Sequence, residues 1–206
     1  MTWDDLRSSY DHVAHKYEKR FLDELANKPR DRELLDRFAL AVDDPVIEIG
    51  CGPGQVGAHL RGKGRRVVGI DLSSEMARLA AGRLDGAACA DMAALPLRAT
   101  SVAGLLAFYS IIHLPRAAVT EALREFCRVL RPGGRVLLSA HEGDGEYHAQ
   151  QFLDEDVPFV ATFFQLDELV DAATTAGLDA TLAERRPSYA TESGTVRLYL
   201  EAMRRR

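Results

Sequence analysis

Short apolar runs alternate with amphipathic stretches between residues 46 and 140. The runs at 46–49 and 67–70 are followed directly by Gly50 and Asp71. Strands buried on both faces have this composition, and helices are expected in the stretches that join them. The alternation predicts an α/β fold built on a mostly parallel sheet.

The remaining elements follow from the same pattern. We expect strands at 46–50, 67–71, 87–90, 102–108 and 135–140, and helices at about 54–62, 73–84 and 115–130. A helix at 166–176 should end at Gly177, and strands at about 178–185 and 195–202 follow it. About nine residues separate these last two strands, too few for a crossover helix, so the pair should be antiparallel.

Two regions outside this alternation have their own character. Residues 3–27 have helical spacing with Tyr10 and Tyr17 near one face, Lys28-Pro29 interrupts the pattern, and a second helix is expected at about 31–42. Residues 141–164 show no clean period. Such a stretch in a compact domain is more often a functional loop or lid than a filler.

Composition describes one ordinary globular domain over residues 1–206, with 47% hydrophobic and 28% charged residues. The net charge of -5 gives no general attraction to nucleic acid or to a membrane surface, so neither is an expected partner. No signal peptide or membrane span is recognisable, and the three cysteines lack disulfide or zinc spacing. A bacterial, cytoplasmic protein without a metal is expected.

The most informative segment is Glu48-Ile49-Gly50-Cys51-Gly52-Pro53-Gly54. Alternating glycines after a strand let the backbone turn tightly and approach a ligand, and the next helix offers free N–H groups. A dinucleotide fingerprint places a third glycine where this chain has Gln55. Glu48 would repel a diphosphate and attract an ammonium or sulfonium group. These features favour S-adenosylmethionine over a dinucleotide.

Two carboxylates at later strand ends complete the expected pocket. Asp71 stands 21 positions after Gly50, where such folds bind two ribose hydroxyls. Asp91 ends the third strand, where its carboxylate can accept from an adenine amino group. The faces of an adenine could lie between Leu72, Met76 and Met92.

In this order the motifs resemble those of class I S-adenosylmethionine-dependent methyltransferases, in the small-molecule branch with an N-terminal helical cap. The resemblance covers nearly the whole chain and rests on an ordered set of segments. These segments are Tyr10-Asp11 to Tyr17, Glu48 to Gly54, Gly69 to Ser73, Ala90-Asp91-Met92, Phe108 to His113, and Arg128 to Gly134. Glu48 departs from the commoner aspartate and keeps its charge.

The resemblance implies a Rossmann-like sheet of seven strands in the order 3-2-1-4-5-7-6, with the last strand antiparallel and helices on both faces. It also implies a cap at 1–29 and a substrate-side loop or lid at 141–165. The implied cofactor-binding residues are Tyr10, Tyr17, Glu48, Gly50, Cys51, Gly52, Gly54, Gln55, Asp71, Leu72, Met76, Asp91, Met92, Phe108, Tyr109 and Ile112. Tyr10 and Tyr17 could equally be core aromatic residues of the cap.

Methyl transfer needs alignment of the acceptor with the methyl group, and a base only when the acceptor is a hydroxyl or a protonated amine. His113 and His141 stand at strand ends and are the candidate bases, although a structural role for each is open. Four phenylalanines between 152 and 164 favour a small apolar or aromatic acceptor. The methylated atom, and whether the protein is a monomer or a homodimer, stay open.

Two other functions remain possible at this level. A non-catalytic protein that binds S-adenosylmethionine would keep the same pocket, because fold alone does not prove turnover. An oxidoreductase that uses a nicotinamide cofactor would share the sheet but needs a different glycine spacing.

Overall fold

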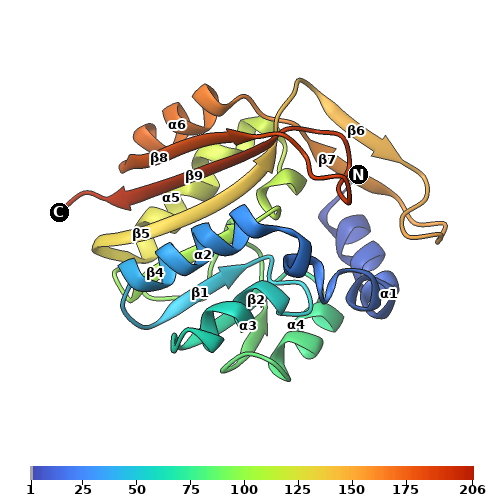
Figure 1. Ribbon diagram of the computed structural model, residues 1–206, viewed down its shortest axis with the longest axis horizontal. Helices are drawn as coiled ribbons and strands as arrows, with labels where there is room; N and C mark the ends of the chain where they lie inside the picture. Colours follow the sequence, from blue (N-terminus) through green and yellow to red (C-terminus); the bar gives the residue numbers. More distant parts are fainter. Residues whose placement is uncertain (1) are drawn as a thin grey trace.

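The computed structural model describes residues 2–206 (Figure 1). Its main sheet has seven strands in the order β3-β2-β1-β4-β5-β9-β8. Their bounds are β1 (Val46–Ile49), β2 (Val67–Asp71), β3 (Ala87–Cys89), β4 (Val102–Phe108), β5 (Leu130–His141), β8 (Leu178–Arg186) and β9 (Arg197–Arg204). Only β9 runs antiparallel to its neighbours. The predicted fold class, strand order and antiparallel final pair are confirmed.

Side-chain alternation along the central strands divides the core into two clusters, one on each face of the sheet. Ile47 and Ile49 pack with α5 (Val119–Val129) and α6 (Leu166–Thr175). Val46 lies on the other face with α2 (Pro29–Ala41) and α3 (Gln55–Gly62). The sheet is therefore covered on both sides (Figure 1). Within residues 2–206, no helix has the length and apolar character to cross a membrane.

The N-terminal segment forms a helix, α1 (Trp3–Phe21), which lies beyond the carboxyl ends of the central strands (Figure 1). A short 3-10 helix, η1 (Glu24–Asn27), continues it, so the single helix expected over 3–27 is divided in two. Pro29 begins α2 and does not merely interrupt the pattern. Proline is favoured at a first helical position because the N–H it lacks would have no helical partner there.

The expectation of irregular structure over 141–164 is wrong in part. A two-stranded antiparallel hairpin, β6 (Glu146–Ala149) and β7 (Phe159–Thr162), lies within this stretch. Each strand has only four residues, too few to show a period in the sequence. β5 also begins five residues earlier than expected, at Leu130, with a register irregularity opposite Val102–Gly104.

The two ends of the described chain lie far apart. α1 starts beside the carboxyl edge of the sheet, whereas β9 ends on the opposite side of the molecule (Figure 1). Because the sheet strands point toward α1, that edge is where a ligand site is expected in an open α/β sheet.

Candidate functional site

A cavity of about 720 Å³, partly open to solvent, lies at the carboxyl edge of the sheet beneath α1. This volume includes space that is open to solvent. Most residues predicted to bind the cofactor line it. They are Tyr10, Tyr17, Gly50, Gly52, Asp71, Leu72, Met76, Asp91, Met92, Phe108 and Tyr109.

The glycine turn after β1 forms the floor of the cavity. Gly50, Gly52 and Gly54 all have positive φ, between 51° and 88°, and Gln55 begins α3. A Cβ on Gly50 would stand 2.3 Å from the Cβ of Ser110, so the end of β4 leaves room only for glycine. The ring of Tyr17 lies over Gly52, where a Cβ would come 3.7 Å from its Cε1 atom.

Glu48 does not line the cavity, so the structure does not place its carboxylate against a cationic group of a ligand. Its carboxyl is 2% exposed and accepts from the N–H of Gly57 at 2.9 Å. Since side chains alternate along β1, Ile49 faces the cavity and Glu48 points beneath α3. Burial raises its pKa well above the usual range and favours the uncharged form. Glu48 therefore anchors the helix that follows the turn.

Four other residues predicted for the cofactor also lie outside the cavity wall. Cys51 is 2% exposed and packs against Gly69, Gly54 contacts α4 (Ser74–Ala81), and Ile112 is buried in the core. Gln55 donates to Glu24 at 2.9 Å, and its own Oε1 is buried without a partner. The turn therefore brings its glycines, and not its side chains, to the ligand.

Asp71 joins the turn to the end of β2. Its Oδ2 accepts from the N–H of Gly52 at 2.8 Å, and its Oδ1 accepts from the N–H of Ser73 at 2.9 Å. A carboxylate has about four lone-pair sites, so each oxygen can still accept from a ribose hydroxyl. Burial, opposed by these hydrogen bonds and aided by nearby Asp11, raises the pKa of Asp71 to about 6.

The far end of the cavity is mainly apolar. Leu72, Met76 and Met92 line it beside Asp91, whose Oδ1 accepts from the N–H of Ala93 at 2.8 Å. α1 adds residues that sequence analysis did not assign to the site. These are Trp3, Leu6 and Arg7. Their signal was the helical spacing of 3, 6 and 10, which puts Trp3 and Leu6 on the face of Tyr10.

α1 is tied down by Asp11. The Oδ1 atom of Asp11 accepts from the hydroxyl of Ser73 at 2.6 Å and from the N–H of Glu75 at 3.1 Å. It thus interacts with the N-terminus of α4, where negative charge is favourable. This contact holds α1 over the strand end that carries Asp71.

His113 lies in the cavity wall and connects three parts of the chain. It follows β4 in the 3-10 helix η2 (Ile111–His113). Its Nδ1 lies 2.8 Å from the carbonyl of Val160 in β7, so Nδ1 carries the proton and donates. Nε2, 2.8 Å from the hydroxyl of Tyr10 in α1, then accepts. Burial lowers the pKa of His113 to about 4, so the ring is neutral at neutral pH.

His141 lies behind the cavity wall. Its ring stands 5.2 Å from that of Tyr109, which lines the cavity, and its Nδ1 pairs with the hydroxyl of Thr195 at 2.8 Å. Burial, together with nearby Arg197 and Lys28, lowers the pKa of His141 to about 4. The structure thus separates the two predicted bases, with only His113 at the cavity.

The residues present suit S-adenosylmethionine. Next to the glycine turn, Ser110 lines the cavity and its Oγ is buried without a hydrogen-bond partner, as expected where a polar ligand is bound. Asp71 would hold the ribose, the apolar far end would hold the adenine, and Gly50 and Gly52 would meet the amino-acid end. Among residues 2–206, no group of three or more His, Cys, Asp or Glu side chains could hold a metal ion.

Comparisons with known proteins agree with this geometry. Residues 46–134 match the family described as a methyltransferase domain. An uncharacterised methyltransferase of Geobacillus kaustophilus is 29% identical over 134 residues, 64% of this chain and 61% of that protein. A malonyl-[acyl-carrier protein] O-methyltransferase of Erwinia billingiae is 35% identical over 133 residues, 62% of this chain and 51% of that protein. The match spans less than two thirds of either relative.

Among solved structures, a 1,6-didemethyltoxoflavin-N1-methyltransferase of Burkholderia thailandensis has the same fold. It contains 1,6-didemethyltoxoflavin and S-adenosylhomocysteine, and it superposes with a TM-score of 0.75 at 23% identity. The alignment covers 98% of this chain and 88% of that one.

The fold and the site have the features of class I S-adenosylmethionine-dependent methyltransferases. Residues 46–134 match a methyltransferase domain, and solved methyltransferases of this fold contain S-adenosylmethionine or S-adenosylhomocysteine.

Proposed function

We propose that the protein transfers a methyl group from S-adenosylmethionine to a small apolar or aromatic acceptor. The observation that carries this proposal is one cavity that joins Asp71, the glycine turn and His113 under α1. The two relatives with a named acceptor methylate different compounds, which supports methyl transfer as the class of reaction. The acceptor of this protein is therefore inferred from its own residues.

Aromatic side chains support the acceptor class. The hairpin loop brings Phe152 to 5.8 Å from the ring of Tyr10, and Phe152 stacks on Phe159 at 4.5 Å. α1 and residues 141–165 thus meet above the cavity through aromatic contacts. We propose that residues 1–29 act as the cap and residues 141–165 as the lid of a single domain.

The mechanism we propose rests on alignment and exclusion of water. S-adenosylmethionine, when bound, supplies an activated methyl group. In this proposal, the aromatic contacts of Tyr10 with Phe152 limit the access of water to the cavity, and the ends of β1 and β4 fix where an acceptor can lie. Alignment alone can contribute ~7–11 kcal/mol to lowering a barrier. His113 is neutral and pairs with Tyr10 of α1 and with Val160 of β7, and in this proposal it mainly holds α1 and β7 in position.

A binding test separates this function from a nicotinamide-dependent one. S-adenosylhomocysteine should raise the melting temperature and NADH should not, because a ligand that binds only the folded state stabilises it. Trp3 is the single tryptophan of the chain and lines the cavity, so its fluorescence should change on binding. A Trp3→Phe variant is the control for the optical signal. Absence of any effect of S-adenosylhomocysteine would contradict the proposal.

Turnover needs a second measurement, because a non-catalytic binding protein would pass the first. Methyl transfer from labelled S-adenosylmethionine should be measured over a panel of aromatic hydroxyl, amine and carboxylic acid acceptors. Tight binding without transfer to any of them would favour the non-catalytic alternative. With a working acceptor, unchanged turnover in both His113→Ala and His141→Ala would exclude a histidine base.

A further inference from the structure

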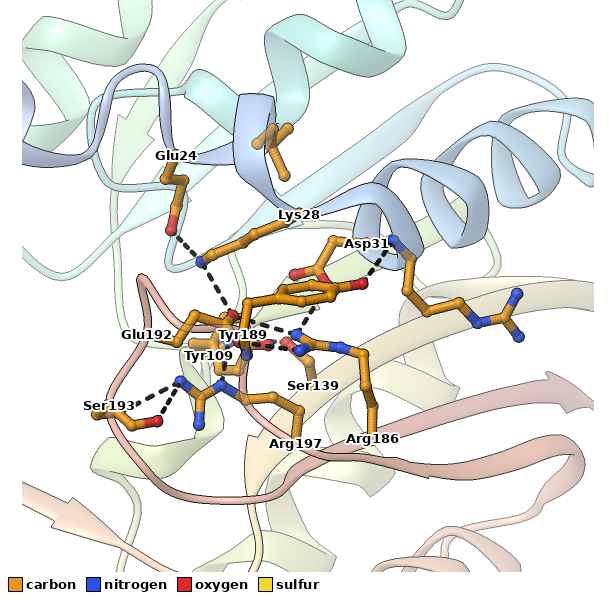
Figure 2. Close-up of polar contacts among 12 residues, drawn as sticks. Glu24, Lys28, Asp31, Tyr109, Ser139, Arg186, Tyr189, Glu192, Ser193 and Arg197 are labelled. Atoms are coloured by element: carbon orange, nitrogen blue, oxygen red, sulfur yellow. Dashed lines mark hydrogen bonds and ion pairs between the residues drawn. The ribbon is translucent and has the colours of Figure 1, made fainter.

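A cluster of buried charges lies beside Tyr109 (Figure 2). Three cations meet there from distant parts of the sequence, namely Lys28, Arg186 and Arg197. Their side chains are 13%, 9% and 4% exposed. Burying charge is costly unless each charge is compensated, so this concentration of cations needs an anion.

Glu24 pairs with Lys28 at 2.5 Å, and Asp31 pairs with Arg186 at 3.1 Å. Among residues 2–206, Glu192 is the one carboxylate that lies near all three cations. It accepts two hydrogen bonds from Arg186, at 2.9 and 3.1 Å, in the two-pronged geometry typical of arginine and a carboxylate. Arg197 and Lys28 stand 3.6 and 3.8 Å away, and the N–H of Tyr189 donates to it at 2.7 Å. Figure 2 shows the carboxylate between the three cations. These contacts lower the pKa of Glu192 to about 2.

The position of Glu192 in the chain is unusual for a group so well buried. It belongs to the loop between β8 and β9, where Thr191, Ser193 and Gly194 are all exposed. The backbone hydrogen bonds inside this loop are local, from Glu192 to Tyr189 and from Thr195 to Ser193. One carboxylate therefore reaches from an exposed loop into a buried cluster of cations that come from the segment before α2 and from the ends of β8 and β9.

The cationic cluster lies next to a residue of the cavity wall, Tyr109. Lys28 Nζ lies 5.4 Å from the centre of the Tyr109 ring, and the Arg197 guanidinium lies 5.9 Å from it. Tyr109 itself lines the cavity.

We propose that Lys28, Arg186 and Arg197 form the recognition site for a carboxylate group of the methyl acceptor, with the Glu192 side chain as its internal competitor. The acceptor is then an apolar or aromatic acid, and the β8–β9 loop moves when it binds. This inference rests on the proposed methyl transfer, since it assigns the substrate class of the same site.

The test compares acids with their neutral amides on the unmodified protein. Phenylacetate and cinnamate are titrated by calorimetry against phenylacetamide and cinnamide, with and without S-adenosylhomocysteine. Each acid should bind roughly 10- to 100-fold more tightly than its amide, the contribution of a hydrogen bond to a charged group. Arg197→Gln and Lys28→Met should each remove most of this preference. Equal binding of acid and amide, or no binding of either, overturns the inference.

The variant Glu192→Gln distinguishes a competing role of Glu192 from a purely structural one, because the two roles predict opposite changes in the affinity for phenylacetate. Removal of a competing charge should tighten the binding of phenylacetate, by about tenfold if one charge-assisted contact is relieved. If Glu192 is only structural, the variant should bind phenylacetate no better, or worse, which would contradict the proposal. Glu121→Gln, at an exposed pair with Arg124, is the control. A stabilising effect of S-adenosylhomocysteine on the same samples separates failure here from failure of the proposed function.

Discussion

At the scale of single residues, Asp71 shows how a binding group can also hold its own site together. Its two oxygens accept from the N–H groups of Gly52 and Ser73, so the carboxylate fixes the glycine turn relative to the end of β2. Burial of the Asp71 carboxyl raises its pKa to about 6. Cofactor affinity should therefore depend on pH near neutrality.

We expect the affinity for S-adenosylhomocysteine to fall as the pH drops through about 6, because a protonated Asp71 is a poorer acceptor for ribose hydroxyls. The groups that face it are Asp11 of α1, the N–H groups of Gly52 and Ser73, and the hydroxyls of Tyr10 and Tyr17. Asp71→Asn should weaken binding roughly 10- to 100-fold and abolish the inflection. Calorimetry between pH 5 and 8 measures both.

The exposed variant Asp179→Asn is the control for the loss of one carboxylate. If Asp71→Asn kept the pH dependence of the unmodified protein, another group would have to be responsible.

At the scale of elements, α1 packs on the domain through its buried apolar residues and is oriented by a few specific polar contacts. Asp11 accepts from two groups at the N-terminus of α4, and Tyr10 pairs with His113. On the hairpin side, Glu155 pairs with His12 at 3.0 Å and also with Lys16. α1 is therefore bound to α4 and to η2, both of which contribute to the cavity wall, and to the loop of the β6–β7 hairpin.

We expect Asp11→Ala to lower the free energy of unfolding by about 1 kcal/mol, the usual effect of removing a helix N-terminal cap. It should also weaken S-adenosylhomocysteine binding, because α1 would no longer be fixed over Asp71. Asp4→Ala is the matched control on the same helix, since Asp4 pairs only on the surface, with Arg7. Thermal unfolding and calorimetry of the two variants should differ; identical results would show that Asp11 does not anchor α1.

At the scale of the whole molecule, His113 is where the N-terminal helix, the sheet and the hairpin meet. Its pKa, lowered to about 4 by burial, makes this junction sensitive to acid. In the unfolded chain a histidine binds a proton below about pH 6.5, whereas the folded ring stays neutral until about 4. Its contribution to stability is therefore complete above 6.5 and is lost as the pH falls toward 4.

Asp71 and Glu48 have raised pKa values, so their protonation stabilises the folded protein as the pH falls and opposes the effect of His113. The effect of His113 is therefore measured as the difference in the free energy of unfolding between the unmodified protein and a His113 variant. His113→Asn keeps a donor for the carbonyl of Val160 and should be less stable than the unmodified protein at pH 7. The gap between them should narrow by roughly 3 kcal/mol between pH 7 and 4, as a shift of this size implies. Urea unfolding at each pH measures it, and a constant gap would contradict the assignment.

The sequence predicts the sheet and the ribose end of the site because both depend on local signals. Apolar runs, glycines and strand-end carboxylates locate β1, β2 and Asp71 directly. The charge of Glu48 favours a contact with a cationic ligand, but its alternation with Ile47 and Ile49 directs its side chain to the other face of the sheet. The β6–β7 hairpin and the cluster of Lys28, Arg186 and Arg197 could not be predicted, since short strands carry little periodicity and the cations are distant in sequence.

The opposite placement of the two chain ends has a practical consequence for anyone who handles this protein. Trp3 borders the mouth of the cavity, while β9 ends far from it (Figure 1). An affinity tag or fluorescent protein joined ahead of α1 would lie next to Trp3 and would interfere with ligand binding to the cavity. The same tag joined after Arg206 would lie far from the cavity (Figure 1).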